Sequence, residues 1–280
     1  MSITSEVGVD LQLTDDELEA VHEHIVSFIQ ERADAAGTER AVLGLSGGID
    51  STLTAYLAAE ALGPENVHGL VMPSETNAGE NMSDAERVAE DLGIAYDVIE
   101  IDPIAEAFLD PLPDVDPDER VETDPLRTAV GNLRVRIRAV CDYFVANLEG
   151  GLVLGTGNRT EALVGYFTKY GDGAVDCHPI GILYKQQVRQ LATHVGVPEH
   201  IVTKTPTAGL WTGQTDEDEL GIDYDTLDAV LALTVDGPFP PSAAVRLVER
   251  VSPEQVEWVH DLPERSEHKR HVPPAPEPLW

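Results

Sequence analysis

The sequence is short of basic residues, above all lysine. Its 280 residues include 51 acidic and 18 basic ones, a formal net charge of −33, and the only lysines are Lys169, Lys185, Lys204 and Lys269. Such an acidic surface repels nucleic acid and anionic membranes, so we expect neither as a partner. We interpret the charge as an adaptation to a cytoplasm of very high salt, where screening is strong. Because lysine is so rare, each one becomes a candidate site residue.

Cysteines and long apolar runs are scarce as well. The two cysteines, Cys141 and Cys177, are too few for a metal cluster and suit a reducing compartment. The sequence has no apolar run of membrane-spanning length and no apolar leader, so we expect a cytoplasmic protein. An acidic interaction protein is the alternative, but the acids are spread along the chain and 42% of the residues are hydrophobic. That composition is typical of a folded domain.

A glycine-containing loop between a strand and a helix is the most informative segment. The apolar run 41–45 predicts a buried strand, Ser46-Gly47-Gly48 follows, and 50–62 has the apolar spacing of a helix. Backbone N–H groups of such a loop can approach a phosphate at the helix N-terminus. Asp50 would repel a bare phosphate, which favours a role in holding Mg²⁺. The alternative is an ordinary turn with a capping serine.

Strands and helices alternate along the rest of the chain. We predict strands at 41–45, 67–72, 94–101, 152–154 and 179–183, and helices at 14–37, 50–62, 83–93 and 126–148. The segment 110–124, rich in proline and acid, is predicted to be a surface connection. This order predicts an α/β fold, a doubly wound parallel sheet with helices on both faces and a ligand over the carboxyl ends of the strands.

A second candidate site follows the fourth predicted strand. Gly155 and Gly157 flank Thr156, which is expected to face the same crevice as Ser46. Glu161 begins the next helix and, with Asp50, offers the oxygen ligands that Mg²⁺ prefers. Taken alone, a glutamate at this position is more often a helix-start acid stabilised by the helix dipole, and only its pairing with the glycine-containing loop favours Glu161 as a metal ligand.

Together these motifs resemble the ammonia-dependent NAD synthetase family, within the ATP pyrophosphatases. The loop Ser46-Gly47-Gly48-Ile49-Asp50-Ser51 is similar to the ATP pyrophosphatase loop, and the resemblance extends in order from about Gly44 to Arg270. The other segments that carry it are Asn132–Arg138, Gly155-Thr156, Glu161, Gly165–Gly173, Asp176, Lys204–Leu210, Asp218–Tyr224 and His268-Lys269-Arg270. Val71-Met72-Pro73 departs from the pattern, because many bacterial members carry an arginine before this proline.

The resemblance implies a Rossmann-like fold and a two-step reaction. ATP activates the carboxylate of deamido-NAD as an adenylate with release of pyrophosphate, and ammonia then displaces AMP to give NAD. The implied catalytic residues are Asp50, Lys185 and Glu161, with Asp50 and Glu161 as Mg²⁺ ligands. The implied ATP-binding residues are Gly44, Leu45, Ser46, Gly47, Gly48, Ile49, Asp50, Ser51, Thr156, Lys185 and Thr207. For deamido-NAD they are Arg136, Tyr143, Lys169, Asp176, His268 and Lys269.

The resemblance also implies a homodimer with the dinucleotide across its interface, for which the helix 126–148 is the natural candidate; the alternative is a plain core helix. Arg134, Arg136 and Arg138 alternate, so they cannot all share one helical face. We expect one domain over 1–280, with a core of about 14–262 and a substrate-binding tail of about 263–280. The loops 74–83 and 204–219 are expected to close over ATP.

Other functions share the glycine-containing loop. GMP synthetase and asparagine synthetase remain alternatives, as does a nucleotide-binding regulator without turnover. A tRNA thiolation enzyme is disfavoured, because it needs reactive cysteines and a basic surface for RNA. Retention of Asp50, Glu161 and Lys185 together argues against a regulator.

Overall fold

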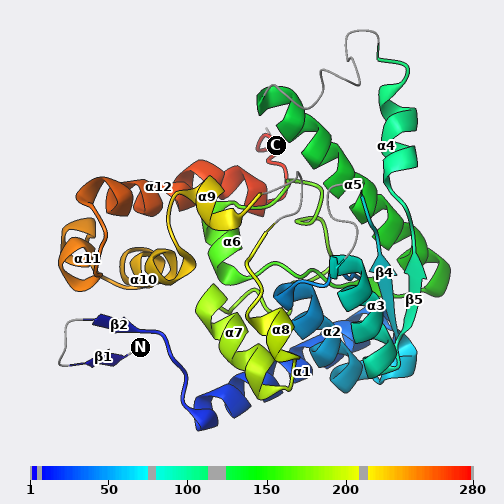
Figure 1. Ribbon diagram of the computed structural model, residues 1–280, viewed down its shortest axis with the longest axis horizontal. Coiled ribbons are helices and arrows are strands. Elements are labelled where there is room, and N and C mark those ends of the chain that lie inside the picture. The colour runs from blue at the N-terminus through cyan, green and yellow to red at the C-terminus, as the bar shows by residue number, and fades with distance from the viewer. Residues whose placement is uncertain (1, 5–7, 75–79, 113–123, 208–213, 279–280) are drawn as a thin grey trace.

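A parallel sheet of four strands forms the centre of the molecule (Figure 1). The computed structural model describes residues 2–4, 8–74, 80–112, 124–207 and 214–278. The strands are β3 (Ala41–Gly44), β4 (Val67–Val71), β5 (Ala95–Val98) and β6 (Leu152–Val153), in the spatial order β5-β4-β3-β6. Ala41 lies opposite Val67 on one side and Leu152 on the other. The predicted parallel sheet is confirmed.

Helices cover both faces of the sheet, as predicted. Successive residues of β3 separate the faces, because Leu43 belongs to one buried apolar cluster and Val42 to another. The first face carries α1 (Asp15–Ala36), α2 (Ile49–Leu62), α3 (Glu80–Leu92), α7 (Lys185–His194) and α8 (Glu199–Val202). The second carries α4 (Asp102–Leu109) and α5 (Asp124–Glu149). A short 3₁₀ helix, η1 (Pro64–Asn66), leads into β4.

A smaller helical layer packs beside the sheet, on the left of Figure 1. It consists of α6 (Arg159–Val164), α9 (Asp216–Leu220), α10 (Tyr224–Thr234), α11 (Pro241–Leu247) and α12 (Pro253–Arg270). A hairpin of β1 (Ser2–Thr4) and β2 (Gly8–Asp10) lies at its edge. Tyr224, Leu231 and Val256 are fully buried within this layer. Since α10 contacts both α6 and α7, the layer supports the two helices that carry Glu161 and Lys185.

Four details of the predicted elements differ. The prediction of a strand at 179–183 is wrong. The backbone N–H of Gly181 donates to the carbonyl of His178, and that of Leu183 to the carbonyl of Ile180, so this segment forms turns. Ile180 and Leu183 are buried without being part of a sheet. Helix α3 begins at Glu80, so Ser83 lies inside it and does not cap it. The strand predicted over 94–101 shortens to β5, and α4 was not predicted. Parts of the predicted closing loops (75–79, 208–213) and of the connection (113–123) lie outside the described residues.

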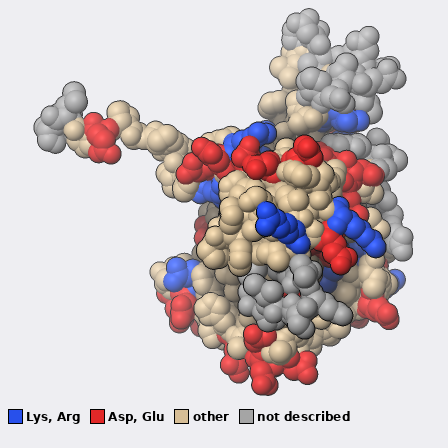
Figure 2. Space-filling model, turned by 90° about the vertical axis from the view of Figure 1, so that its left-hand side faces the viewer, with Lys and Arg blue, Asp and Glu red and all other residues tan. Residues whose placement is uncertain are grey.

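The surface is strongly acidic. Asp and Glu side chains are spread over the face drawn in Figure 2, with a few basic ones among them. Within the residues that the structure describes, no helix combines the length and the apolar character needed to cross a membrane.

Candidate active site

The loop between β3 and α2 folds back on itself through its serines. Gly47 has φ +73°, a backbone conformation that favours glycine, and so turns the chain tightly after the strand. The backbone N–H of Ser46 donates to Ser51 Oγ at 3.2 Å, and the two hydroxyl oxygens lie 3.0 Å apart. The N–H of Gly48 donates to Ser46 Oγ at 3.3 Å. The hydroxyls of Ser46 and Ser51 thus lie where a phosphate could bind at the N-terminus of α2.

Three predicted catalytic residues meet beside this loop. The ammonium of Lys185 donates to Asp50 Oδ2 at 2.6 Å and to Glu161 Oε1 at 3.1 Å. Asp50 lies in the first turn of α2, Glu161 in that of α6, and Lys185 is the first residue of α7. The residue Lys185 is only 2% exposed. Segments far apart in the sequence therefore build one charged cluster, as the resemblance implied.

Asn158 is a member of this cluster that sequence reasoning missed. Its Nδ2 donates to Asp50 Oδ1 at 2.8 Å, while its Oδ1 accepts the N–H of Glu161 at 3.0 Å. Asn158 and Glu161 thus form a capping box, so Glu161 serves both as the helix-start acid and as a partner of Lys185. The available signal was an N-cap residue in the same loop as Thr156.

The single ammonium of this cluster lies between two carboxylates. Burial disfavours the charged ammonium, but Asp50 and Glu161 outweigh that cost and hold the pKa of Lys185 above its ordinary value. For Glu161, burial raises the pKa and Lys185 opposes the shift. The ring of Tyr224 lies 5.0 Å from the Lys185 ammonium, and its hydroxyl donates to Asp216 at 2.9 Å. Lys185 is thus enclosed by negative charge and an aromatic face.

Hydrogen bonds from the smaller layer fix the start of α7. The backbone N–H of Lys185 donates to Thr160 Oγ1 at 3.0 Å, and that hydroxyl donates to Asp228 Oδ1 at 2.5 Å. The second oxygen of Asp228 accepts the N–H of Gln186 at 2.9 Å. Asp228, fully buried on α10, therefore ties α6 and α7 together.

The loop after β6 lies close against neighbouring side chains. A Cβ on Gly155 would lie 2.5 Å from His178 Nδ1, so only glycine fits there. Thr156 follows it and is part-buried, at the carboxyl end of β6 as predicted. Thr207, the other predicted ATP contact, is exposed at the last described position before 208–213.

The predicted dinucleotide residues gather mainly around the segment 165–173. Arg136 on α5 donates to the carbonyl of Lys169 at 3.3 and 3.2 Å. Lys269, in the last turn of α12, donates to the carbonyls of Gly165 and Phe167 at 2.7 and 2.9 Å. The ammonium of Lys169 lies 3.5 Å from His268 Nδ1. Arg136, Lys169, His268 and Lys269 therefore form one basic group, which we call the cationic group.

Asp176 and Tyr143 form a separate pair. Tyr143 donates to Asp176 Oδ1 at 3.3 Å, while Asp176 Oδ2 accepts the N–H of Val153 at 2.8 Å. Burial, followed by the charge of Asp176, raises the pKa of Tyr143 to about 12. Asp176 thus holds β6 in place through Val153 and also contacts Tyr143, a candidate dinucleotide-binding residue.

The three alternating arginines of α5 point in different directions, as predicted. Arg134 pairs with Asp102 on α4 at 2.9 Å, and Arg138 donates to the carbonyl of Met72 at 3.2 Å. Arg136 is the one that reaches the segment 165–173.

The remaining lysine has a different partner. Lys204 donates to Asp84 Oδ2 at 2.8 Å, and His200 lies 3.3 Å from the other oxygen of this buried carboxylate. Lys204 thus joins the chain after α8 to α3. Three of the four rare lysines fall in the predicted site, and Lys204 neutralises a buried acid elsewhere.

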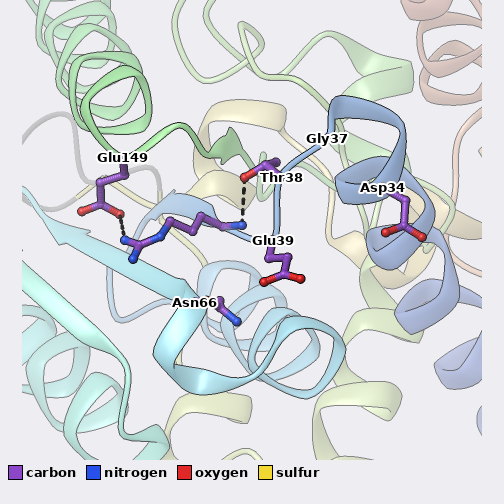
Figure 3. Close-up of a pocket in the computed structure, with 7 residues that line it drawn as sticks. Asp34, Gly37, Thr38, Glu39, Asn66 and Glu149 are labelled. Carbon is purple, nitrogen blue, oxygen red and sulfur yellow. Dashed lines mark hydrogen bonds and ion pairs between the residues drawn. The ribbon is translucent and has the colours of Figure 1, made fainter.

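A polar cavity of about 600 Å³ lies at the other end of the sheet. Thr38 and Glu149, which line it, are labelled in Figure 3. The backbone N–H of Arg40 donates to Thr38 Oγ1 at 3.1 Å, and its guanidinium lies 3.6 Å from Glu149 Oε2. Arg40 immediately precedes β3, so the cavity lies at the amino ends of the strands. It contains none of the predicted site residues.

Comparison with known proteins connects this geometry to a family. Residues 21–273 match the family model of NAD synthase. The chain belongs to the NAD synthase family. It is 58% identical over 268 residues to the NH(3)-dependent NAD(+) synthetase of Halobacterium salinarum (strain ATCC 29341 / DSM 671 / R1), covering 96% of this chain and 97% of that one. It is 47% identical to the NH(3)-dependent NAD(+) synthetase of Hyperthermus butylicus, covering 95% and 94%.

Solved structures agree with the NAD synthase fold. The NH3-dependent NAD synthetase of Campylobacter jejuni superimposes with a TM-score of 0.74 at 30% identity, covering 93% of this chain and 99% of that one. The NMN synthetase of Francisella tularensis superimposes with a TM-score of 0.76 at 33% identity, covering 96% and 100%. The Rossmann-like fold is confirmed, and the chain is an enzyme of the NAD synthetase ligase class.

Proposed function

We propose that this enzyme converts deamido-NAD to NAD with ATP and ammonia. The nicotinate carboxylate attacks the α-phosphorus of ATP, forming an acyl–phosphate bond as pyrophosphate leaves. Ammonia then attacks the acyl carbon, AMP leaves with the bridging oxygen, and one proton is released. The observation that carries this proposal is the contact of Lys185 with both Asp50 and Glu161 beside the glycine-containing loop, within a chain of the NAD synthase family.

We propose that the chain orients and neutralises its substrates, since no covalent nucleophile is required. The loop Gly44–Ser51, with Thr156 and Thr207, would hold ATP, its N–H groups facing the pyrophosphate. Lys185 would neutralise the charge that develops on the phosphates.

The carboxylates of Asp50 and Glu161 fit Mg²⁺. A single cation, the ammonium of Lys185, already contacts both of them, and carboxylate oxygens are the ligands that Mg²⁺ prefers. We propose that these two residues hold Mg²⁺ when ATP binds, where it would offset phosphate charge.

The deamido-NAD site is proposed at the cationic group, with Asp176 and Tyr143 beside it. Arg136 and Lys269 are held by backbone carbonyls and not by carboxylates, so their charge remains available for the phosphates of the dinucleotide. Tyr143 offers a ring for stacking.

We also propose a homodimer that pairs through α5. Val140, Phe144 and Leu148 lie four residues apart on this helix and are 68%, 63% and 71% exposed. An apolar stripe of this kind favours a protein interface. The sequence left the helix 126–148 open as an interface or as a plain core helix. One side of α5 carries this exposed stripe, and another buries Ile137 and Ala146 against the sheet.

Domain organisation, location in the cell and adaptation to salt are further proposals. We propose one domain over 1–280 with a substrate-binding tail from 263; this boundary falls inside α12. The free cysteines suit the cytoplasm, and the net charge suits high salt. A thermal unfolding midpoint that rises with KCl would support the adaptation to salt, and a flat or falling one would contradict it.

The direct test is to incubate the enzyme with ATP, Mg²⁺, ammonium and deamido-NAD in molar KCl. We expect NAD and AMP in equal amounts. Glutamine alone, in ammonia-free reagents, should give no product. The deamidated mononucleotide should be a poor substrate, because it lacks the AMP half of deamido-NAD and with it one of the two phosphates that the cationic group would bind. Nucleotide binding without AMP release would instead support a regulator.

A further inference from the structure

Two histidines from different helices lie close together far from the proposed active site. His22 is on α1, and His194 is in the last turn of α7, at the opposite end of that helix from Lys185. Their ring centroids are 6.1 Å apart and the rings are nearly perpendicular, at 74°. Each faces a carboxylate: His22 Nε2 lies 2.8 Å from Glu60 Oε2 on α2, and His194 Nε2 lies 3.2 Å from Glu19 Oε2 on α1.

We propose that Glu19, His22 and His194, with Glu60 beside them, form a binding site for a divalent transition metal. Ligand atoms of the first three residues all lie within 4.8 Å of one another. Tetrahedral Zn²⁺ with bonds of about 2.0–2.1 Å places its ligand atoms roughly 3.3 Å apart. Side-chain rotations that move each of these three atoms by about 1 Å therefore close the site. Glu60, whose Oε2 lies 2.8 Å from His22 Nε2, is the candidate fourth ligand.

The composition of the site selects the class of metal. Imidazole suits Zn²⁺, Co²⁺, Ni²⁺ and Cu²⁺, whereas Mg²⁺ prefers an all-oxygen shell. Two neutral imidazoles and two carboxylates also neutralise a divalent ion. This site is thus chemically distinct from the Asp50–Glu161 pair, which offers oxygens.

The fold holds the ligands in place. Glu19 and His22 are three residues apart on α1 and so share one face. The side chain of His22 is only 16% exposed, and α1 packs against both α2 and α7. A bound metal would link α1 to the last turn of α7, the helix whose first residue is Lys185, and would stabilise the folded chain by mass action.

The test uses the full chain without a histidine tag, titrated with Co²⁺ in the presence of excess Mg²⁺. We expect the visible absorption of tetrahedral Co²⁺ at one ion per chain, its loss when Zn²⁺ is added, and a higher thermal unfolding midpoint with Zn²⁺. The variants His22→Gln and His194→Gln should each weaken Co²⁺ binding by at least about tenfold. His24→Gln, two residues away on the exposed side of α1, is the matched control and should bind as the wild type does.

Three results would overturn the proposal. The first is the absence of tetrahedral Co²⁺ absorption in the wild type, which would leave two ordinary His–Glu ion pairs. The second is unchanged binding in both histidine variants. The third is loss of the signal in Asp50→Asn, which would place the ion in the active site. If the histidine variants fold poorly, Glu19→Gln, at an exposed position, gives the same test: weakened binding supports the site and unchanged binding overturns it.

Discussion

The two halves of the proposed site carry their charge in different ways. Lys185 is buried and contacts two carboxylates, so the positive charge near the glycine-containing loop is neutralised within the protein. In the cationic group, Lys269 and Arg136 donate to backbone carbonyls, and Lys169 lies against His268. The first half sets two carboxylates against one ammonium and so has no excess of positive charge before any substrate arrives, whereas the second keeps an excess of positive charge.

The difference indicates a division of work. A buried ammonium already fixed between two carboxylates costs little reorganisation when charge develops on the phosphates, which favours catalysis. A partly exposed group of cations attracts an anionic ligand in a protein that is otherwise strongly acidic, which favours binding. Substitutions in the first half should therefore affect turnover, and those in the second half should affect affinity.

The largest effect is expected for Lys185→Met. It leaves the part-buried carboxylates of Asp50 and Glu161 beside each other without their shared cation, so we expect a loss of roughly 3 kcal/mol in the free energy of unfolding. Turnover should also fall by at least about a thousandfold. Lys204→Met is the matched control, since it also removes a lysine from a buried acid, Asp84. It should lower stability while keeping AMP release within about tenfold. Equal turnover in the two variants would contradict the assignment of Lys185.

Asp50→Asn separates charge from shape. The amide keeps an oxygen for the bond from Asn158 but removes a proposed Mg²⁺ ligand. We expect weak binding of ATP in the presence of Mg²⁺ and a loss of several kcal/mol of transition-state stabilisation. Calorimetric titration and AMP release measure the two quantities. Wild-type activity in this variant would refute the metal assignment.

Asp142 offers the contrast of a buried carboxyl without an adjacent ammonium. It lies on α5 under Gly44, its Oδ1 has no hydrogen-bond partner, and burial raises its pKa to about 7, with Arg138 opposing the shift. Because the pKa is raised in the folded state, its contribution to stability is complete below pH 3.8 and is lost as the pH rises through about 7.

The wild type should therefore lose about 3 kcal/mol more than Asp142→Asn does between pH 4 and pH 7. Chemical denaturation at several pH values measures this difference. Parallel curves for the two proteins would show that Asp142 titrates normally.

The smallest effect is expected for Lys169→Met. Removing one exposed cation should raise KM for deamido-NAD about tenfold and leave kcat nearly unchanged. Because screening weakens exposed charges, the difference between variant and wild type should shrink as KCl rises from about 0.1 M to 1 M. A change in kcat with constant KM would place Lys169 among the catalytic residues.

Much of this molecule could be predicted from its sequence, where local patterns agreed with the fold. The capping box at Thr14 and Glu17 and the strand–Gly47–helix turn are local signals, and both are confirmed. The scarcity of lysine made each of the four lysines, Lys185 among them, a candidate site residue on composition alone.

Other features depend on contacts that the sequence does not display. Asn158 and Tyr224 reach the cluster only because α10 packs on α6 and α7 and α7 packs on α2. Ile180 and Leu183 mimic a strand, yet their burial comes from turns packed under α7. Helix α4 does have the apolar spacing of a helix in its sequence, because Ile101, Ala105 and Leu109 are four residues apart and all three are buried.

The central claim is that this site joins a carboxylate to the α-phosphorus of ATP. The most direct measurement uses deamido-NAD labelled with ¹⁸O in the nicotinate carboxylate, followed by mass spectrometry of the products formed with ammonium. Our account predicts one ¹⁸O atom in each AMP, because the attacking oxygen leaves with the phosphate, and none in pyrophosphate. Labelled pyrophosphate with unlabelled AMP, or formation of ADP and labelled phosphate in place of AMP and pyrophosphate, would contradict it.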